Sequence, residues 1–198
     1  MNIRIPKQKR SRERKSRIME TALDLFSRNG LNKTSSNEIA KKAGVSIGTF
    51  YSYFENKKTL FLEILKEHLD NFITGIYTLQ TDDSIALKEN IRSHIQKTFT
   101  VFDLHPSFHK EALVSKFSDP DVKRLFDEVE QKQLDIISIL LKPYCRNKDP
   151  QDLLEVSKVI HSAVENVAHY VKFLDSPMDK DRLIDELTEM IYHYVNSL

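Results

Sequence analysis

Hydrophobic residues recur every three or four positions along most of this chain, which is the spacing of one face of an α-helix. This pattern predicts a first helix from residue 11 to residue 28, which Asn29-Gly30 ends. A longer pattern covers residues 57–77, and another covers residues 87–102. Since the chain also has only four glycines, six prolines and few alternating stretches typical of strands, it is expected to be all-α.

Four prolines indicate where further helices begin, because the first turn of a helix tolerates proline and the residue before it can act as the cap. Helices are therefore expected from Pro106, from Asp119-Pro120 to Pro143, after Asp149-Pro150 and after Ser176-Pro177. With two shorter helices near the N-terminus, the chain should contain about nine helices.

Residues 36–54, SNEIAKKAGVSIGTFYSYF, have the order of a helix, a tight turn and a second helix. Gly44 tolerates the left-handed conformation at a helix end, and Ser46 can cap the next helix. Phe50 and Phe54 lie four residues apart and form its apolar face. The other face stays free, as in a helix-turn-helix that reads the major groove of DNA. The alternative is an ordinary helical hairpin inside a core.

The free face carries residues that suit DNA. The Ile47 side chain and the Thr49 methyl group can touch a thymine methyl, and Gly48 allows close approach of the backbone. Tyr51 and Tyr53 can donate to phosphates, although Tyr53, next to Phe54, can equally belong to the core. Lys57 lies at the start of another helix, which is a favourable place for a phosphate.

Charge is distributed unevenly along the chain, although its net charge is only +1. Residues 1–60 hold 14 Lys/Arg against 5 Asp/Glu, a net of +9, whereas residues 61–198 have a net of −8. A basic head on an acidic body indicates nucleic-acid binding at one end. Residues 1–10 lack apolar periodicity and are expected to form a flexible basic arm that reaches DNA, the alternative being a merely solubilising tail.

The N-terminal third resembles the TetR family of transcriptional regulators. The matching segments are Arg17-Ile18, Ala22-Leu23-Asp24-Leu25-Phe26, Asn29-Gly30, Thr34-Ser35, Glu38-Ile39-Ala40, Ala43-Gly44-Val45-Ser46, Gly48-Thr49-Phe50-Tyr51, Tyr53-Phe54, Lys57 and Leu60. The resemblance implies a homodimer with an N-terminal three-helix DNA-binding domain at residues 11–56 and a helical effector-binding and dimerisation domain at residues 57–198. The DNA contacts that it implies are Thr34, Ser35, Ser46, Ile47, Gly48, Thr49, Tyr51, Tyr53 (where the family often has histidine) and Lys57.

The same resemblance implies an effector pocket among the middle helices. Its expected lining is Phe99, Phe102, His105, His109, Phe117 and Tyr144, each of which can instead be an ordinary core or surface residue. The last two helices carry an apolar stripe wider than one core contact requires, which predicts that they pack against a second copy as a four-helix bundle. The expected dimer contacts are Ala163, Val164, Val167, Val171, Leu187, Ile191 and Tyr194, the alternative being that both helices lie in the monomer core.

Other chemistry is not indicated. The sequence contains no nucleophile–base arrangement, phosphate-binding glycine loop or catalytic carboxylate pair, so neither an enzyme nor a cofactor is expected. His105 and His109 lack further ligands at suitable spacing, so no metal is expected either. A single cysteine, Cys145, excludes an internal disulfide. With no signal peptide or membrane-spanning run, the protein is expected to be cytoplasmic and to have no membrane partner.

The expected function is therefore a regulator that binds a palindromic operator in double-stranded DNA as a homodimer. Most simply it is a repressor that a small-molecule effector releases from DNA. The alternative is a structural or protein-recruiting factor that uses the same DNA-binding head and senses no small molecule. A helical protein that does not bind DNA is hard to reconcile with the +9 charge of residues 1–60.

Overall fold

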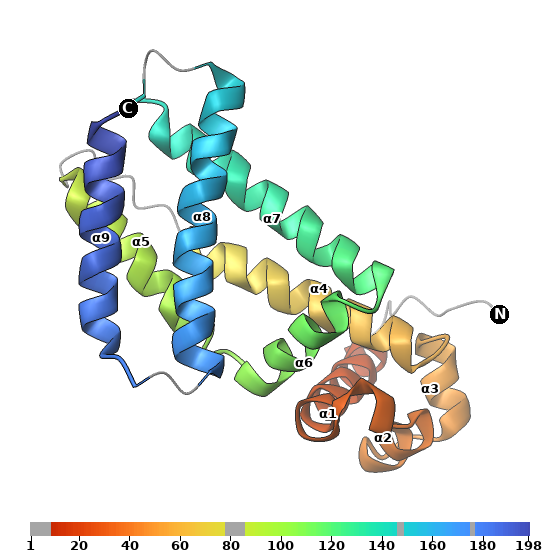
Figure 1. Cartoon of the computed structure of the whole chain (residues 1–198). Helices are drawn as coiled ribbons and strands as arrows, with labels where there is room; N and C mark the ends of the chain where they lie inside the picture. Colours follow the sequence, from red (N-terminus) through yellow and green to blue (C-terminus); the bar gives the residue numbers. More distant parts are fainter. Residues whose placement is uncertain (1–8, 78–85, 146–148, 175–176) are drawn as a thin grey trace. The chain divides into compact units, whose positions relative to one another are not determined.

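The computed structural model describes residues 9–77, 86–145, 149–174 and 177–198. Within these ranges the chain forms nine helices and no strand, which confirms the predicted all-α fold (Figure 1). The helices are α1 (Lys9–Lys33), α2 (Ser36–Lys42), α3 (Ile47–Tyr53), α4 (Lys57–Ile76), α5 (Leu87–Val101), α6 (Pro106–Lys116), α7 (Pro120–Leu141), α8 (Pro150–Phe173) and α9 (Lys180–Asn196). None of the helices in the described part is long and apolar enough to span a bilayer.

Most of the predicted helix boundaries are confirmed by their caps. The Ser35 hydroxyl accepts from the Glu38 amide over 3.1 Å, and the Asp149 carboxylate accepts from the Asp152 amide over 2.8 Å. Gly30 interrupts α1 with φ 77° and ψ 164°, close to the predicted end of the first helix. The predicted flexible arm comprises residues 1–10. Residues 1–8 lie outside the described residues, and residues 9 and 10 form the start of α1.

The predicted start of the last helix is wrong. Helix α9 begins at Lys180, and its cap is Asp179, whose carboxylate accepts from the Arg182 amide over 2.8 Å. Pro177 precedes the helix, and Ser176 lies outside the described residues. The charged carboxylate of Asp179 is a strong acceptor for an unpaired helix amide, so it sets the boundary three residues after the proline.

The chain divides into two compact units. One contains the chain up to His68 together with His105–Leu125, and the other contains Leu69–Leu104 and Phe126–Leu198. This division differs from the contiguous domains 11–56 and 57–198 expected from the sequence. The first unit includes α6, because the buried Phe108 ring lies 5.2 Å from the Phe61 ring, which in turn lies 5.3 Å from that of Phe26.

The second unit has a continuous apolar core formed by α5, α8 and α9 with the adjoining parts of α4 and α7. Helix α5 packs along α9, and α8 packs against both of them. His94 is half-buried in this unit, and burial, with smaller contributions from His161 and Lys97, lowers its pKa to about 4. This histidine is therefore uncharged at neutral pH.

Candidate nucleic-acid interface

Helices α2 and α3 form the predicted helix-turn-helix. Gly44 has φ 66°, the left-handed conformation that the tight turn needs, and its amide donates to the Lys41 carbonyl over 3.2 Å. The Val45 amide donates to the Ala40 carbonyl over 3.0 Å, which completes the turn. Ile39 and Phe50 are fully buried between the helices. The hydrophobic pattern thus holds α3 against α2 and leaves the opposite face of α3 to solvent.

The exposed face of α3 begins at its cap. Ser46 accepts from the Thr49 amide over 3.1 Å, and the hydroxyls of the same two residues lie 2.8 Å apart. Ile47 and Tyr51 are more than one-third exposed, at 38% and 36%, and Gly48 is exposed between them. An apolar group, hydroxyls and a phenol therefore share one solvent-facing helix surface, which can contact both base edges and phosphates.

Two of the predicted DNA-contacting side chains lie inside the unit. Tyr53 is only 3% exposed, and its phenol is hydrogen-bonded to the Ser11 hydroxyl over 2.8 Å. Thr34 is buried as well, and its hydroxyl donates to the Gly30 carbonyl over 2.8 Å. Tyr53 therefore lies in the core, which was the alternative left open for it. Both side chains hold α1 in place and are not part of the exposed face, whereas Ser35 is exposed at the cap of α2.

Lys57 also differs from the expected phosphate contact. Its ammonium group donates to the backbone carbonyls of Leu31, Asn32 and Thr34, at 2.8, 3.1 and 2.7 Å. An ammonium group has three N–H donors, and all three are used here. The lysine therefore anchors residues 31–35, which follow the kink at Gly30 and lead into α2, to the start of α4. We call these residues the α1–α2 connection. This role could not be predicted from the sequence, because the local pattern around a lysine at a helix start is the same whether its side chain faces solvent or a segment 23 to 26 residues earlier.

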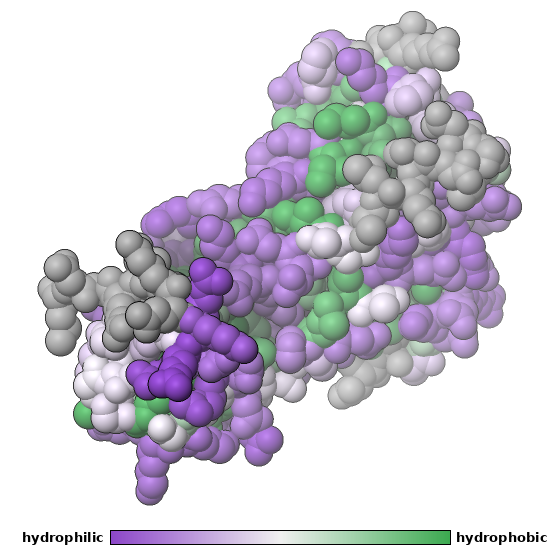
Figure 2. All heavy atoms as spheres, turned by 180° about the vertical axis from the view of Figure 1, so that it is seen from behind, coloured by the Kyte–Doolittle hydropathy of each residue, from purple (hydrophilic) through white to green (hydrophobic). Residues whose placement is uncertain are grey.

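Basic side chains are exposed on the helices that precede α3. Arg12, Arg14 and Arg17 are exposed on the first turns of α1, and Figure 2 shows strongly hydrophilic side chains gathered where α1 begins. Lys41 is exposed at the end of α2. This distribution is suited to a polyanion such as the DNA backbone.

An ionic cluster holds the start of α7 within the same unit. The Lys58 ammonium lies 2.7 Å from the Asp121 carboxylate and 2.9 Å from that of Asp119. These contacts raise the pKa of Lys58, and the lysine holds the pKa values of Asp119 and Asp121 below their usual range. All three groups therefore stay charged at neutral pH, and the lysine is engaged within the protein.

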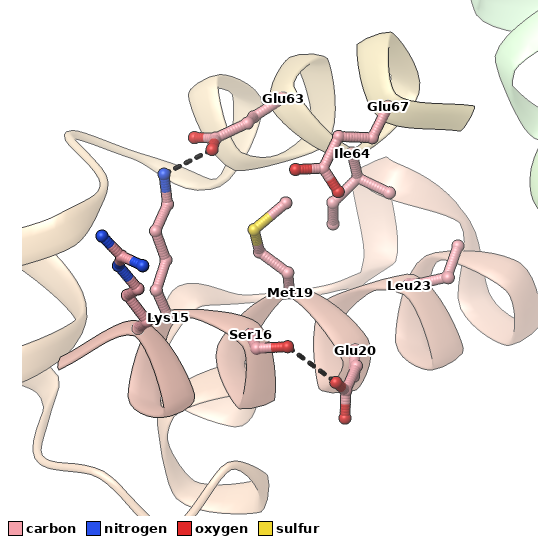
Figure 3. Close-up of a pocket in the computed structure, with 9 residues that line it drawn as sticks. Lys15, Ser16, Met19, Glu20, Leu23, Glu63, Ile64 and Glu67 are labelled. Atoms are coloured by element: carbon pink, nitrogen blue, oxygen red, sulfur yellow. Dashed lines mark hydrogen bonds and ion pairs between the residues drawn. The ribbon is translucent and has the colours of Figure 1, made fainter. Parts of the chain in front are cut away.

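A pocket of about 530 Å³ lies between α1 and α4 in this unit (Figure 3). Met19 and Ile64 contribute apolar surface to it, and Lys15 forms an ion pair with Glu63 across it. The remaining lining residues are Arg12, Ser16, Glu20, Leu23 and Glu67. None of the residues predicted to bind an effector lines this pocket.

The six predicted effector residues have different environments. Phe99 and Phe102 are buried in the core of the second unit, where Tyr144 is exposed. In the first unit His105 is exposed, and His109 is buried with Nδ1 3.2 Å from His68 Nε2. Phe117 is 90% exposed, because it follows the last residue of α6 in the turn toward α7, so the expected lining role is not supported by its position.

The described residues contain no group of three or more histidine, cysteine or acidic side chains arranged to hold a metal. Burial, with a smaller contribution from His105, lowers the pKa of His68 to about 4, so the His68 ring that contacts His109 is uncharged at neutral pH. Cys145 is buried.

The predicted dimer residues divide between core and surface. Val164, Leu187 and Ile191 are buried in the core of the second unit, as the monomer-core alternative expects. Ala163, Val167 and Val171 are half-buried against that core, and Tyr194 is 36% exposed. Other apolar side chains are exposed on the same two helices, namely Val159, Tyr170 and Leu174 at the outer side of α8 and Met190 beside Tyr194 on α9. We call these four and Tyr194 the outer α8–α9 face.

This chain is similar to known bacterial regulators. Residues 18–64 match the family described as bacterial regulatory proteins, tetR family. The uncharacterized HTH-type transcriptional regulator YuxN of Bacillus subtilis is 30% identical over 146 residues, which cover 70% of this chain and 48% of YuxN. The fatty acid metabolism regulator protein of Bacillus subtilis is 25% identical over 152 residues, which cover 75% of this chain and 76% of that protein. This chain thus spans about half the length of the first relative and three quarters of the second.

The fold has solved counterparts. The transcriptional regulator FadR from Bacillus subtilis, crystallised in complex with stearoyl-CoA, superposes with a TM-score of 0.69 at 22% identity, covering 89% of this chain and 96% of that one. The family match falls on the segment that contains the later part of α1, α2, α3 and the start of α4. Residues 18–64 are therefore a segment of the tetR family of bacterial regulatory proteins, and the chain as a whole shares its fold with FadR.

Proposed function

We propose that this protein is a DNA-binding transcriptional repressor that binds a palindromic operator as a homodimer and is released by a small-molecule effector. The observation that carries the proposal is the exposed face of α3. The helix-turn-helix keeps this face out of the core, and basic residues are exposed on the neighbouring helices. The relative YuxN is itself described as an HTH-type transcriptional regulator, and the second relative as a regulator of fatty acid metabolism, in agreement with this proposal.

Within the proposed complex, α3 lies in the major groove. Ile47 and the Thr49 methyl group contact base edges, and the Tyr51 phenol donates to a phosphate. Ser35, Ser46 and Gly48 border this face and supply a hydroxyl or a close backbone approach. Thr34, Tyr53 and Lys57 support the face from behind, since their polar groups are bonded within the unit.

Dimerisation is assigned to the outer α8–α9 face. These apolar side chains are partly exposed in the monomer, and a two-fold interface would bury their exposed parts in both copies. A dimer also suits DNA, because two reading heads about one helical turn apart match the two halves of a palindrome.

The experiment that tests DNA reading is selection of binding sites from random duplex DNA, followed by titration of variants. Tyr51→Phe should weaken binding to every selected sequence about fivefold to thirtyfold, because it removes a phosphate contact worth about 1–2 kcal/mol. Ile47→Ala should instead change which sequences are selected. Ser93→Ala, at an exposed position on α5, serves as the control and should leave both properties unchanged. Wild-type affinity and selection in the Ile47 and Tyr51 variants would remove α3 from the interface.

The effector class to test first is a long-chain acyl-CoA, since the structure of a similar fold contains stearoyl-CoA and a relative regulates fatty acid metabolism. Stearoyl-CoA should weaken the binding of selected DNA, and by linkage the DNA should weaken stearoyl-CoA binding by the same factor. Calorimetric titration with and without DNA measures both. Effector binding of equal strength in the two titrations would favour the alternative, a DNA-bound structural factor that senses no such ligand.

A further inference from the structure

The connection between α1 and α2 receives a charged hydrogen bond from a distant helix. The Leu31 amide donates to Glu111 Oε1 on α6, with 2.8 Å between nitrogen and oxygen. The two residues are 80 positions apart, but they belong to the same compact unit. The bond becomes possible because Gly30 leaves the helical conformation, which turns the following amide away from the hydrogen-bond ladder of α1. The carboxylate then supplies a charged acceptor.

The Glu111 carboxylate lies close to Gly30, a position whose φ of 77° favours glycine. A Cβ atom there would lie 2.9 Å from Glu111 Oε1 and 3.1 Å from Oε2. The helix that bears the carboxylate is itself fixed, because Phe108 and Ala112 on α6 are fully buried. The carboxylate is therefore presented to the connection by a rigid element.

Both backbone polar groups of Leu31 are held by charged side chains. Glu111 accepts from its N–H, and the Lys57 ammonium donates to its carbonyl over 2.8 Å. The chain runs from there through four residues to Ser36, the first residue of α2, and α2 is joined to α3 by the tight turn at Gly44. Only short segments join these elements, so the position of Leu31 constrains where α2 begins and how α3 is oriented.

We propose that Glu111 is a positioning residue for DNA reading, through which α6 sets operator affinity without touching DNA. The inference rests on the proposed function, since it concerns how strongly α3 engages its operator. Glu111 lies outside residues 18–64, the segment that matches the family, so its role follows from the tertiary contacts of this chain.

The test compares variants of one side chain. Glu111→Ala removes the acceptor and should weaken binding of the selected operator about tenfold, the equivalent of one charged hydrogen bond. Glu111→Gln keeps an acceptor oxygen at the same length and should restore most of the affinity. Lys110→Ala, at the exposed neighbouring position, is the matched control and should bind like the wild type.

Amide hydrogen exchange separates positioning from general destabilisation. In Glu111→Ala the Leu31 amide should exchange at least about tenfold faster, whereas the amide of the buried Ile95 in the other unit should keep its rate. Where Glu111→Ala does not fold, Glu111→Asp keeps the charge but withdraws the oxygen by one methylene, and should show the same changes to a smaller degree.

The outcomes are distinguishable. Faster exchange at Leu31 with unchanged operator affinity would overturn the inference while leaving the proposed function intact, as would a Glu111→Gln variant as weak as Glu111→Ala. A wild-type protein that selects no DNA would refute the proposed function and, with it, any role of Glu111 in DNA reading.

Discussion

The Tyr194→Asp variant should sediment as a monomer and should lose most of its affinity for operator DNA. Tyr194 lies on α9 at the edge of the monomer core, and 36% of it is exposed, so a carboxylate there can remain hydrated in the folded monomer. In the proposed dimer the same carboxylate would be buried without a partner. A two-fold interface contains the change twice, and at about 3 kcal/mol for each buried charge the dissociation constant should rise roughly 10,000-fold.

Sedimentation velocity at micromolar concentration measures this change directly, and circular dichroism establishes that the fold is kept. Val114→Asp, on the exposed side of α6, adds the same charge outside the outer α8–α9 face and should leave the dimer unchanged. Tyr194 is a sharper choice than Val167, because Val167 packs against the monomer core and an aspartate there would also disturb folding. If Tyr194→Asp sediments as a normal dimer, this face is not the interface.

Replacing Lys57 by methionine should lower the free energy of unfolding by about 3 kcal/mol and weaken operator binding as well. Lys57→Met keeps most of the apolar stem but removes the ammonium that satisfies three backbone carbonyls of the α1–α2 connection. Those carbonyls lose their charged donor, and the connection loses its attachment to α4. Operator affinity should fall because the start of α2 is no longer held in place.

Urea unfolding and DNA titration of the same samples measure the two effects. Lys58→Met is the matched control, because its ammonium contacts the side chains of Asp119 and Asp121 near the surface and no backbone carbonyl of the connection. Its loss of stability should be clearly smaller. A Lys57→Met variant as stable as the wild type that binds all DNA sequences uniformly more weakly would restore the direct phosphate contact first expected for Lys57.

Local patterns predicted the helix-turn-helix well. Gly44 in the turn, Ser35 and Ser46 at the caps and Phe50 on the inner face all have the expected conformation or burial. These features depend on residues within four positions of one another, so the sequence records them directly. The error at α9 has the same origin, since Pro177 and Asp179 are both good start signals and only the observed hydrogen bond decides between them.

Side-chain partners far apart in the sequence were not predictable. Tyr53 meets Ser11 across 42 positions, and Glu111 meets Leu31 across 80, and no spacing rule relates such pairs. The pattern likewise could not separate core residues from surface residues on α8 and α9. The same apolar residue types occur where a helix packs against its own core and where it can pack against a partner. Val164 and Tyr194 were therefore assigned to one interface, although Val164 is core and Tyr194 is surface.

Helix periodicity, caps and net charge are local or additive properties, so they predicted the all-α fold, the position of α3 and the concentration of positive charge in residues 1–60. Three features became visible only in the folded chain: Lys57 donates to backbone carbonyls, α6 belongs to the unit that contains α3, and Glu111 accepts from the Leu31 amide. Burial and hydrogen-bond saturation belong to the folded chain, since they arise when distant segments compete for the same polar groups.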